Sequence, residues 1–199
     1  MIFSATVPDF IQSLSLKYMK NPLLIDLVGD SENQIPEGIT HRAIITSNFQ
    51  SKMRQVENYL KENKDAKVII FSETKSEASS FEKKDWARFF VIHGDVQQST
   101  REKRLDMFRN AKSGVLVATD VAARGLDVED VDAVIQLSCR HLDSFVHRSG
   151  RTGRKGKDGK NFLFFDESDY QFVLRLEKKL KLGMEITGNI SQNTLTAEE

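Results

Sequence analysis

Residues 114–127 read Gly-Val-Leu-Val-Ala-Thr-Asp-Val-Ala-Ala-Arg-Gly-Leu-Asp. The stretch begins with an unbroken apolar run, which is typical of a strand buried on both faces of a parallel sheet. Thr119 and Asp120 follow, and both are residue types that cap helices. The small Ala122 and Ala123 then allow a short helix to begin close against the strand. The stretch therefore predicts a strand, a tight turn and a helix of an α/β protein.

Similar alternation continues along the rest of the chain. Strands are expected at 42–46, 67–72, 89–93, 132–137 and 161–165, and the second of these carries another continuous apolar run, Val68-Ile69-Ile70-Phe71. Helices are expected where apolar side chains recur at helical spacing: Met53, Val56 and Leu60; Leu105 and Phe108; Phe172, Leu174, Leu176 and Leu180. Two capping-box patterns, Thr74-x-x-Glu77 and Ser99-x-x-Glu102, predict helix starts. Together these patterns predict a parallel sheet flanked by helices.

The first forty residues have a different organisation. Residues 4–20 predict a turn followed by a helix with Phe10, Ile11, Leu14 and Tyr18 on one apolar face, and 23–28 predict a strand. Residues 29–38 are polar, flanked by glycines and carry a proline, which is linker composition. We expect four parts: 1–28 from one domain, a linker at 29–38, a main domain at 39–182 and a tail at 183–199.

The composition excludes several classes of protein. The chain has 199 residues, of which 39% are hydrophobic and 29% charged, as in ordinary globular proteins. It contains no apolar run of the length needed to cross a bilayer, and its start lacks the pattern of a signal peptide. Cys139 is the only cysteine, so an internal disulfide is impossible and a reducing, intracellular compartment is expected.

Positive charge is concentrated in one region of a neutral protein. The chain has 29 basic and 29 acidic residues, but 140–160 holds seven basic residues and two acidic ones. Within it, residues 147–154 read His-Arg-Ser-Gly-Arg-Thr-Gly-Arg, which we call the arginine run. Arginine presents a planar, permanently charged fork that fits phosphate oxygens, and glycine lets a backbone approach them. The run predicts a polyphosphate site, and the alternative is a solvated basic loop.

Polar residues follow the expected strands at 72–74, 93–95 and 119–120, and the arginine run follows the strand ending at Leu137. Ligands of open parallel sheets bind at the carboxyl edge, so we expect all four segments to meet there. Exposed backbone N–H groups at 119–123 suit a phosphate, Gly125 permits close approach, and Asp127 is an acceptor for a ribose hydroxyl.

Other chemistries do not fit the sequence. His41, His93, His141 and His147 lack metal-ligand spacing, so no metal site is expected. Ser149 beside His147 does not make a catalytic triad by adjacency alone. The glycines at 153, 156 and 159 do not match the Gly-x-Gly-x-x-Gly of dinucleotide-binding domains.

These residues resemble, in order, the motifs of DEAD-box RNA helicases. The resemblance covers residue 1 to about residue 182 and is carried by Ser4-Ala5-Thr6, Val68-Ile69-Ile70-Phe71, His93-Gly94-Asp95 with Gln98-x-x-Arg101, residues 118–127 and the arginine run. The forms of 3–6, 17–20, 73–75 and 147–150 are most similar to the nucleolar Gu (RNA helicase II) branch. That branch implies a nuclear or nucleolar location.

In that family two RecA-like domains close over ATP and an RNA strand. The resemblance implies that this chain holds the short helix–strand end of the first domain and all of the second, a RecA-like parallel sheet flanked by helices. The implied roles are phosphate contact for Arg151 and Arg154, with Arg154 as the arginine finger; ribose contact for Gly125 and Asp127; RNA-backbone contact, without reading of sequence, for Thr74, Gly94, Arg101 and Thr119; and coupling between domains for Ser4, Thr6, His147 and Arg148.

The chain carries neither a Gly-x-x-x-x-Gly-Lys-[Ser/Thr] phosphate loop nor an Asp-Glu-Ala-Asp motif. The first domain would supply both and hold Mg²⁺, so we expect this chain alone not to hydrolyse ATP. Two alternatives stay open: a binding module with the helicase fold but no catalysis, and a DNA-translocating relative. The N-terminal helix would expose its apolar face without the rest of its domain, so a dimer formed through that helix is also expected.

Overall fold

The computed structural model describes residues 9–23, 35–123, 128, 130–154, 156–189 and 192–194. The predicted site residues Ser4, Thr6, Gly125 and Asp127 lie outside this part of the chain, as does the strand expected at 23–28 apart from Leu23. Two compact units are present, residues 1–34 and residues 35–199, which divide within the predicted linker. Each is considered by itself below.

The first unit contributes one described helix, α1 (Asp9–Tyr18). Its apolar side chains are largely exposed: Leu14 by 44%, Leu16 by 73% and Tyr18 by 71%. Leu14 and Tyr18 belong to the apolar face predicted from the sequence. A helix in this state gains little from packing within its own unit, and it needs another surface to bury that face.

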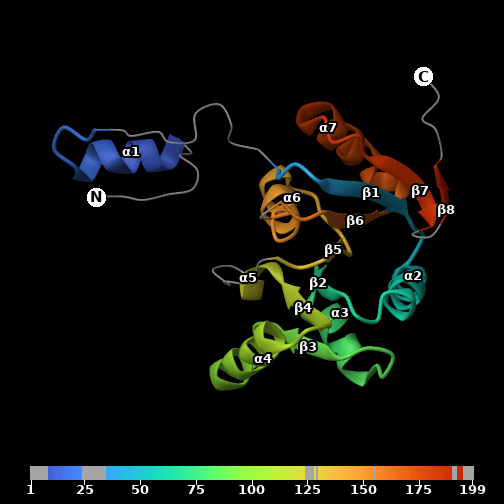
Figure 1. The fold of residues 1–199 in the computed structure, drawn as a ribbon. Helices are drawn as coiled ribbons and strands as arrows, with labels where there is room; N and C mark the ends of the chain where they lie inside the picture. Colours follow the sequence, from blue (N-terminus) through green and yellow to red (C-terminus); the bar gives the residue numbers. More distant parts are fainter. Residues whose placement is uncertain are drawn as a thin grey trace. The chain divides into compact units, whose positions relative to one another are not determined.

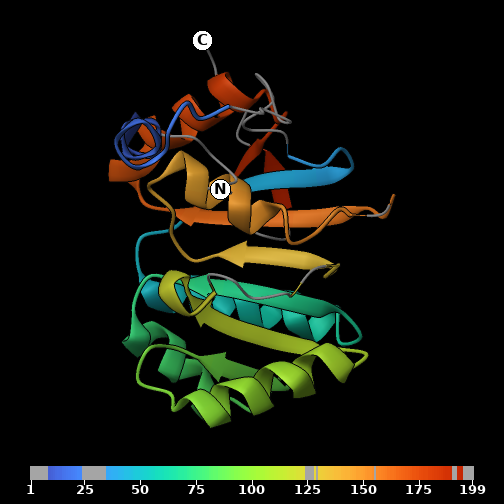
Figure 2. The same ribbon diagram turned by 90° about the vertical axis from the view of Figure 1, so that its left-hand side faces the viewer.

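The second unit is built on one eight-stranded sheet with the order β3-β4-β2-β5-β6-β1-β7-β8 (Figures 1 and 2). All neighbouring strands are parallel except β7 and β8, which pair antiparallel. The strands are β1 (Ile39–Ile45), β2 (Lys67–Ser72), β3 (Phe89–Ile92), β4 (Gly114–Thr119), β5 (Ala133–Gln136), β6 (Gly159–Phe165), β7 (Glu185–Asn189) and β8 (Gln192–Thr194). The six strands expected from the sequence are confirmed.

Helices cover both faces of the sheet. One face carries α2 (Phe49–Glu62), α3 (Lys75–Ser80) and the short 3-10 helix η2 (Phe81–Lys83), which pack on side chains such as Val68 and Ile70. The opposite face carries α4 (Gln98–Asn110), α5 (Asp120–Ala123), α6 (Leu142–Ser149), the 3-10 helix η3 (Glu167–Asp169) and α7 (Tyr170–Leu180). Alternate residues of the central strands face opposite sides, so continuous apolar runs fill both cores.

The two predicted capping boxes have different outcomes. Thr74 caps α3 as expected: its hydroxyl accepts from the Glu77 N–H at 3.1 Å, and Glu77 reaches back to the cap backbone. The Ser99 prediction is wrong, because α4 begins at Gln98 and Ser99 lies inside its first turn. Glu102 instead accepts from the side chain of Gln98 at 2.7 Å.

The segment after residue 182, which the sequence suggested as a tail, adds β7 to the sheet beside β1. Lys181, with a φ of 51°, ends α7 in the left-handed conformation and turns the chain toward that strand. Glu185 of β7 pairs with Arg42 of β1 at 2.8 Å. Among the helices in the described ranges, none has the length and apolarity to cross a membrane.

Candidate functional site

Three of the predicted polar segments meet at the carboxyl edge of the sheet. Ser72 is paired in register with Thr119, and Ile92 with Ala118, so the residues that follow β2, β3 and β4 emerge side by side (Figure 2). The expectation that 72–74, 93–95 and 119–120 share one edge is therefore confirmed. In parallel sheets this edge is the usual place for a ligand.

At this edge the turns after β2 and β3 contact each other. Lys75 Nζ lies 2.5 Å from Asp95 Oδ1, and this hydrogen bond holds the pKa of the Asp95 carboxyl below its ordinary value. Gly94 is exposed, and a Cβ added there would lie 3.3 Å from Lys75 Cε. Behind them, the buried His93 ring makes a 3.0 Å hydrogen bond with Ser79 Oγ. The two turns thus form one exposed surface, made of Thr74, Lys75, Gly94 and Asp95, which we call the ledge.

The four predicted RNA-contact residues divide into two pairs. Thr74 and Gly94 are exposed on this ledge. Thr119 is buried, with 7% of its surface exposed, and Arg101 donates from Nη2 to the Ala122 carbonyl at 2.5 Å. Arg101 therefore ties α4 to α5 and Thr119 is buried at the end of β4, while Thr74 and Gly94 present groups to solvent.

Arg148 of the arginine run is bound within its own domain. Its Nε and Nη2 donate to the two carboxylate oxygens of Asp120 at 2.7 and 2.6 Å, and Nη1 donates to the Ser138 carbonyl at 2.6 Å. Only 8% of the Arg148 side chain is exposed, and its guanidinium lies 5.2 Å from the centre of the Phe71 ring. This paired fork is the strong form of a carboxylate contact, and it fastens α6 to the start of α5.

The rest of the arginine run does not gather at the carboxyl edge, contrary to the expectation from the sequence. The Arg151 carbonyl accepts from the Val131 N–H at 3.3 Å, and Thr152 forms a bridge with Val131, which precedes β5. The physical reason is α6: its eight residues advance the chain by about 12 Å along the sheet face, away from the end of β5. The run thus crosses the face from one edge toward the other (Figure 2).

Internal packing explains one glycine that the sequence argument assigned to phosphate approach. Gly153 has a φ of 67°, and a Cβ there would collide with the side chain of Ile39. Gly150 ends α6, where its N–H donates to the Val146 carbonyl at 2.9 Å. These glycines therefore shape the loop itself, which sets where the arginines lie.

Arg151 and Arg154 are half-buried, and His147 is exposed. Arg154 Nε donates to the Gly150 carbonyl at 2.5 Å, which holds its side chain back against the end of α6. Arg151 lines a small hollow with Phe71, Ala118, Ala123 and Val128, so it lies on the α5 side of the face. Guanidinium groups such as those of Arg151 and Arg154, half-buried on one face, are the donor type that polyphosphates prefer.

Sequence reasoning missed a set of buried polar residues beneath α6. Gln136, Asn161 and His41 have at most 4% of their surfaces exposed, and Gln136 ends an otherwise apolar strand. The signal that could have found them is a polar residue interrupting a buried apolar run, as in Val134-Ile135-Gln136-Leu137.

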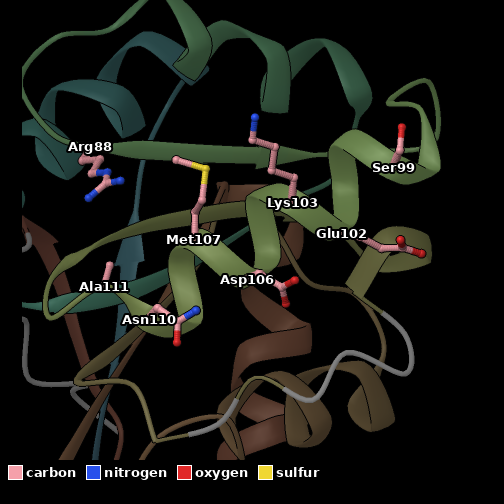
Figure 3. A pocket seen from close by; sticks show the side chains of 8 residues that line it. All are labelled: Arg88, Ser99, Glu102, Lys103, Asp106, Met107, Asn110 and Ala111. Carbon is pink, nitrogen blue, oxygen red and sulfur yellow. The ribbon is translucent and has the colours of Figure 1, made fainter.

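A separate hollow of about 660 Å³ lies along the outer face of α4 (Figure 3). It is lined by Arg88, Ser99, Glu102, Lys103, Asp106, Met107, Asn110 and Ala111. Its charges are mixed in sign, and the predicted site residues are not among those that line it.

A parallel sheet with this ledge at its carboxyl edge and two half-buried arginines on its face is the architecture of a RecA-like helicase domain. The family model for the helicase conserved C-terminal domain matches residues 37–156. The chain therefore belongs to the helicase conserved C-terminal domain family, and the predicted fold and domain type are confirmed.

Similar proteins support this placement. The "DEAD-box ATP-dependent RNA helicase 9, mitochondrial" of Arabidopsis thaliana is 42% identical over 184 residues, which are 90% of this chain and 30% of the relative. "ATP-dependent RNA helicase DBP2" of Eremothecium gossypii is 37% identical over 85% of this chain and 31% of its own length. Among solved structures, "DEAD-box helicase Mss116 bound to ssRNA and UDP-BeF" has a TM-score of 0.76 at 31% identity, over 92% of this chain and 40% of that one. The chain spans 24–31% of the length of similar curated proteins.

Proposed function

We propose that the chain is the second RecA-like domain of a DEAD-box, ATP-dependent RNA helicase. The observation that carries this proposal is the arginine run, anchored through Arg148 and Asp120 so that Arg151 and Arg154 lie half-buried on one face of the sheet. The names of the similar proteins support it, since several are described as DEAD-box ATP-dependent RNA helicases.

In this proposal Arg151 and Arg154 stabilise charge on the phosphates of ATP, with Arg154 as the arginine finger. ATP supplies the phosphoryl group and Mg²⁺ neutralises its oxygens, both held mainly by the first domain. An arginine finger contributes roughly 10³ to 10⁵ in rate, or about 4 to 7 kcal/mol, when the other half of the site is present. Gly125 and Asp127 are proposed to contact the ribose.

The proposed RNA surface is the ledge at the carboxyl edge. Thr74 and Gly94 are proposed to contact the sugar-phosphate backbone, and their exposure at this edge supports the proposal. Arg101 and Thr119 are proposed to act beside them, Arg101 from α4, which it ties to α5, and Thr119 from the end of β4. Contacts of this kind position RNA without reading its sequence.

The proposed coupling between domains rests on His147, Ser4 and Thr6. His147 is exposed on α6 and free to face another domain, whereas the Arg148 guanidinium is occupied by Asp120 and Ser138. We therefore revise the role of Arg148 from a direct coupling contact to the anchor of the helix that carries His147.

Three finer assignments are also proposed, two from the sequence and one from the exposed side chains of α1. The nucleolar Gu branch and a nuclear location rest on the forms of residues 3–6, 17–20, 73–75 and 147–150. Relatives include proteins named as mitochondrial and chloroplastic, so the compartment needs its own measurement by imaging of a tagged protein. A dimer through α1 rests on its exposed apolar side chains and is tested by sedimentation.

The proposal is tested by measuring Mg²⁺-dependent ATP hydrolysis with and without RNA. The 199-residue chain should show none, and the complete protein with its first domain should show RNA-stimulated hydrolysis. The rival function is a helicase-fold module that only binds RNA or protein. It predicts a complete protein that binds RNA but does not hydrolyse ATP, and that result would overturn the proposal.

A further inference from the structure

Six polar side chains form one continuous hydrogen-bonded series beneath α6, from β1 to the start of α5. Five of them have no more than 7% of their surfaces exposed. The series lies on the α6 face of the sheet, between the apolar cluster under α4 and the one under α7. Its members, which we call the buried polar series, are His41, Asn161, Gln136, Ser149, Arg148 and Asp120.

Arg148 fixes the direction of every hydrogen bond in the buried polar series. A guanidinium only donates, so Gln136 must turn its Oε1 toward Arg148 Nη1, at 3.4 Å. Gln136 Nε2 then donates to Asn161 Oδ1 at 3.0 Å and to Ser149 Oγ at 3.3 Å. Asn161 Nδ2 is left to donate to His41 Nδ1 at 3.1 Å, which must therefore be unprotonated. Burial lowers the pKa of His41 to about 4, which agrees with a neutral ring.

The series holds the last turn of α6 at two adjacent residues. Ser149 donates from Oγ to the Phe145 carbonyl at 2.7 Å while accepting from Gln136. Arg148 reaches Gln136 on one side and Asp120 on the other. The chain continues from this turn directly into Arg151 and Arg154, and Arg154 bonds back to the Gly150 carbonyl.

Rotation or translation of α6 would break several of these bonds at once. Each buried donor or acceptor left without a partner pays its full desolvation cost, so one orientation of α6 is strongly favoured. Apolar side chains of similar size could fill the same volume, but they would fix the orientation only through shape.

We propose that His41, Asn161 and Gln136 are positioning residues for the arginine run. They act through Ser149 and Arg148 to fix the last turn of α6, and thereby the places of Arg151 and Arg154. The positional part of this inference is independent of the proposed function, and its catalytic consequence rests on that function.

The positional part is tested in the 199-residue chain by nuclear magnetic resonance, with two variants of one residue. Asn161→Leu keeps the branched shape and the number of side-chain heavy atoms and removes both hydrogen bonds. Asn161→Asp keeps the acceptor for Gln136 and requires a proton on His41 Nδ1. The observables are the exchange rate of the Arg148 Nε–H and the protonation of the His41 ring nitrogens. Thr46→Val, which removes a buried hydroxyl just after β1, is the matched control.

The buried polar series predicts that Asn161→Leu speeds exchange at Arg148 about tenfold or more, the factor that accompanies loss of about 1.4 kcal/mol of local stability. Asn161→Asp should leave that exchange close to wild type while the His41 Nδ1 signal changes to the protonated form. If packing alone held α6, exchange at Arg148 would be faster in Asn161→Asp than in Asn161→Leu, because a buried carboxylate is harder to accommodate than leucine. That result would overturn the proposal. If Asn161→Asp does not fold, His41→Gln and His41→Leu replace the pair, since only the amide keeps an acceptor for Asn161.

The catalytic part is measured in the complete protein as RNA-stimulated ATP hydrolysis. Asn161→Leu should lower kcat about tenfold to a hundredfold with a smaller change in the KM for ATP, as misplacement of a catalytic group does. Thr46→Val should leave both constants unchanged. Equal loss in the two variants would contradict the catalytic part. A wild-type protein without ATPase would contradict the proposed function, while the exchange experiment would still decide the positional part.

Discussion

The pair between Arg148 and Asp120 gives the sharpest prediction for stability, through the substitution Asp120→Asn. The carboxylate accepts two charge-assisted hydrogen bonds, at 2.7 and 2.6 Å, from a guanidinium whose side chain is only 8% exposed. The amide keeps one acceptor oxygen, loses the charge and places an NH₂ group against Arg148.

The magnitude follows from the burial of the two partners. Breaking a fully buried ion pair costs about 3–5 kcal/mol. Asp120 is 40% exposed, so water compensates part of that loss, and Asn keeps one hydrogen bond. We therefore expect about 2 kcal/mol, which lowers Tm by about 4–8 °C for a domain of this size.

The assay is urea unfolding followed by circular dichroism, with a check that the denaturant slope is unchanged. Asp106→Asn is the matched control, because Asp106 also pairs with an arginine, Arg109, but at 3.1 Å and with 67% and 40% of the two side chains exposed. That surface pair should contribute less than about 0.5 kcal/mol. Equal effects of the two substitutions would refute the view that Arg148 is a buried anchor.

Three further predictions concern local features. Thr74→Ala should destabilise the domain by about 1 kcal/mol through loss of the α3 cap, whereas Ser99→Ala, inside α4, should cost less than about 0.5 kcal/mol in the same urea experiment. Gly159→Ala should cost about 2–3 kcal/mol, because its Cβ would lie 2.5 Å from Thr152 Oγ1; Gly188→Ala, with nothing within 4 Å, should be nearly neutral. Burial lowers the pKa of His41 from 6.5 to about 4, so the unfolded chain binds more protons than the folded one between these two pH values. The free energy of unfolding should therefore decrease as the pH is lowered from 6.5 to 4, by about 3 kcal/mol in total. The unfolding free energy of His41→Gln, measured between pH 7 and pH 4, should lack this pH-dependent loss. A pH dependence equal to that of the wild type would contradict the lowered pKa of His41.

The sheet could be predicted because its strands are encoded locally. Runs such as 68–71 and 115–118 are apolar on both faces, and short polar segments mark the end of each strand. The carboxyl-edge ledge followed from the same logic, since parallel strands bring their ends together. The capping of α3 by Thr74 could also be predicted, because both partners of the capping box, Thr74 and Glu77, lie within four residues.

Features that depend on distant contacts could not be predicted in this way. Ser99 matches a capping box, but the turn after His93 starts α4 earlier. The path of the arginine run depends on the length of α6 and on Ile39, more than a hundred residues away in sequence. The buried polar series joins three strands to α6 and the start of α5, and the sequence around each member does not show which distant residues it contacts. Strand β7 lies in a polar segment that carries little of the apolar pattern of the central strands.

The central claim is that this chain supplies one half of an ATP site through the arginine run. It is tested most directly by RNA-stimulated ATP hydrolysis of the complete protein with Arg154→Ala, beside Lys157→Ala as a control. Lys157 lies in the same basic segment, and its ammonium pairs with Asp130 at 2.9 Å. We predict that Arg154→Ala lowers kcat by roughly 10³ or more while the circular dichroism spectrum is retained, and that Lys157→Ala leaves kcat near wild type. Normal hydrolysis by Arg154→Ala would contradict the account.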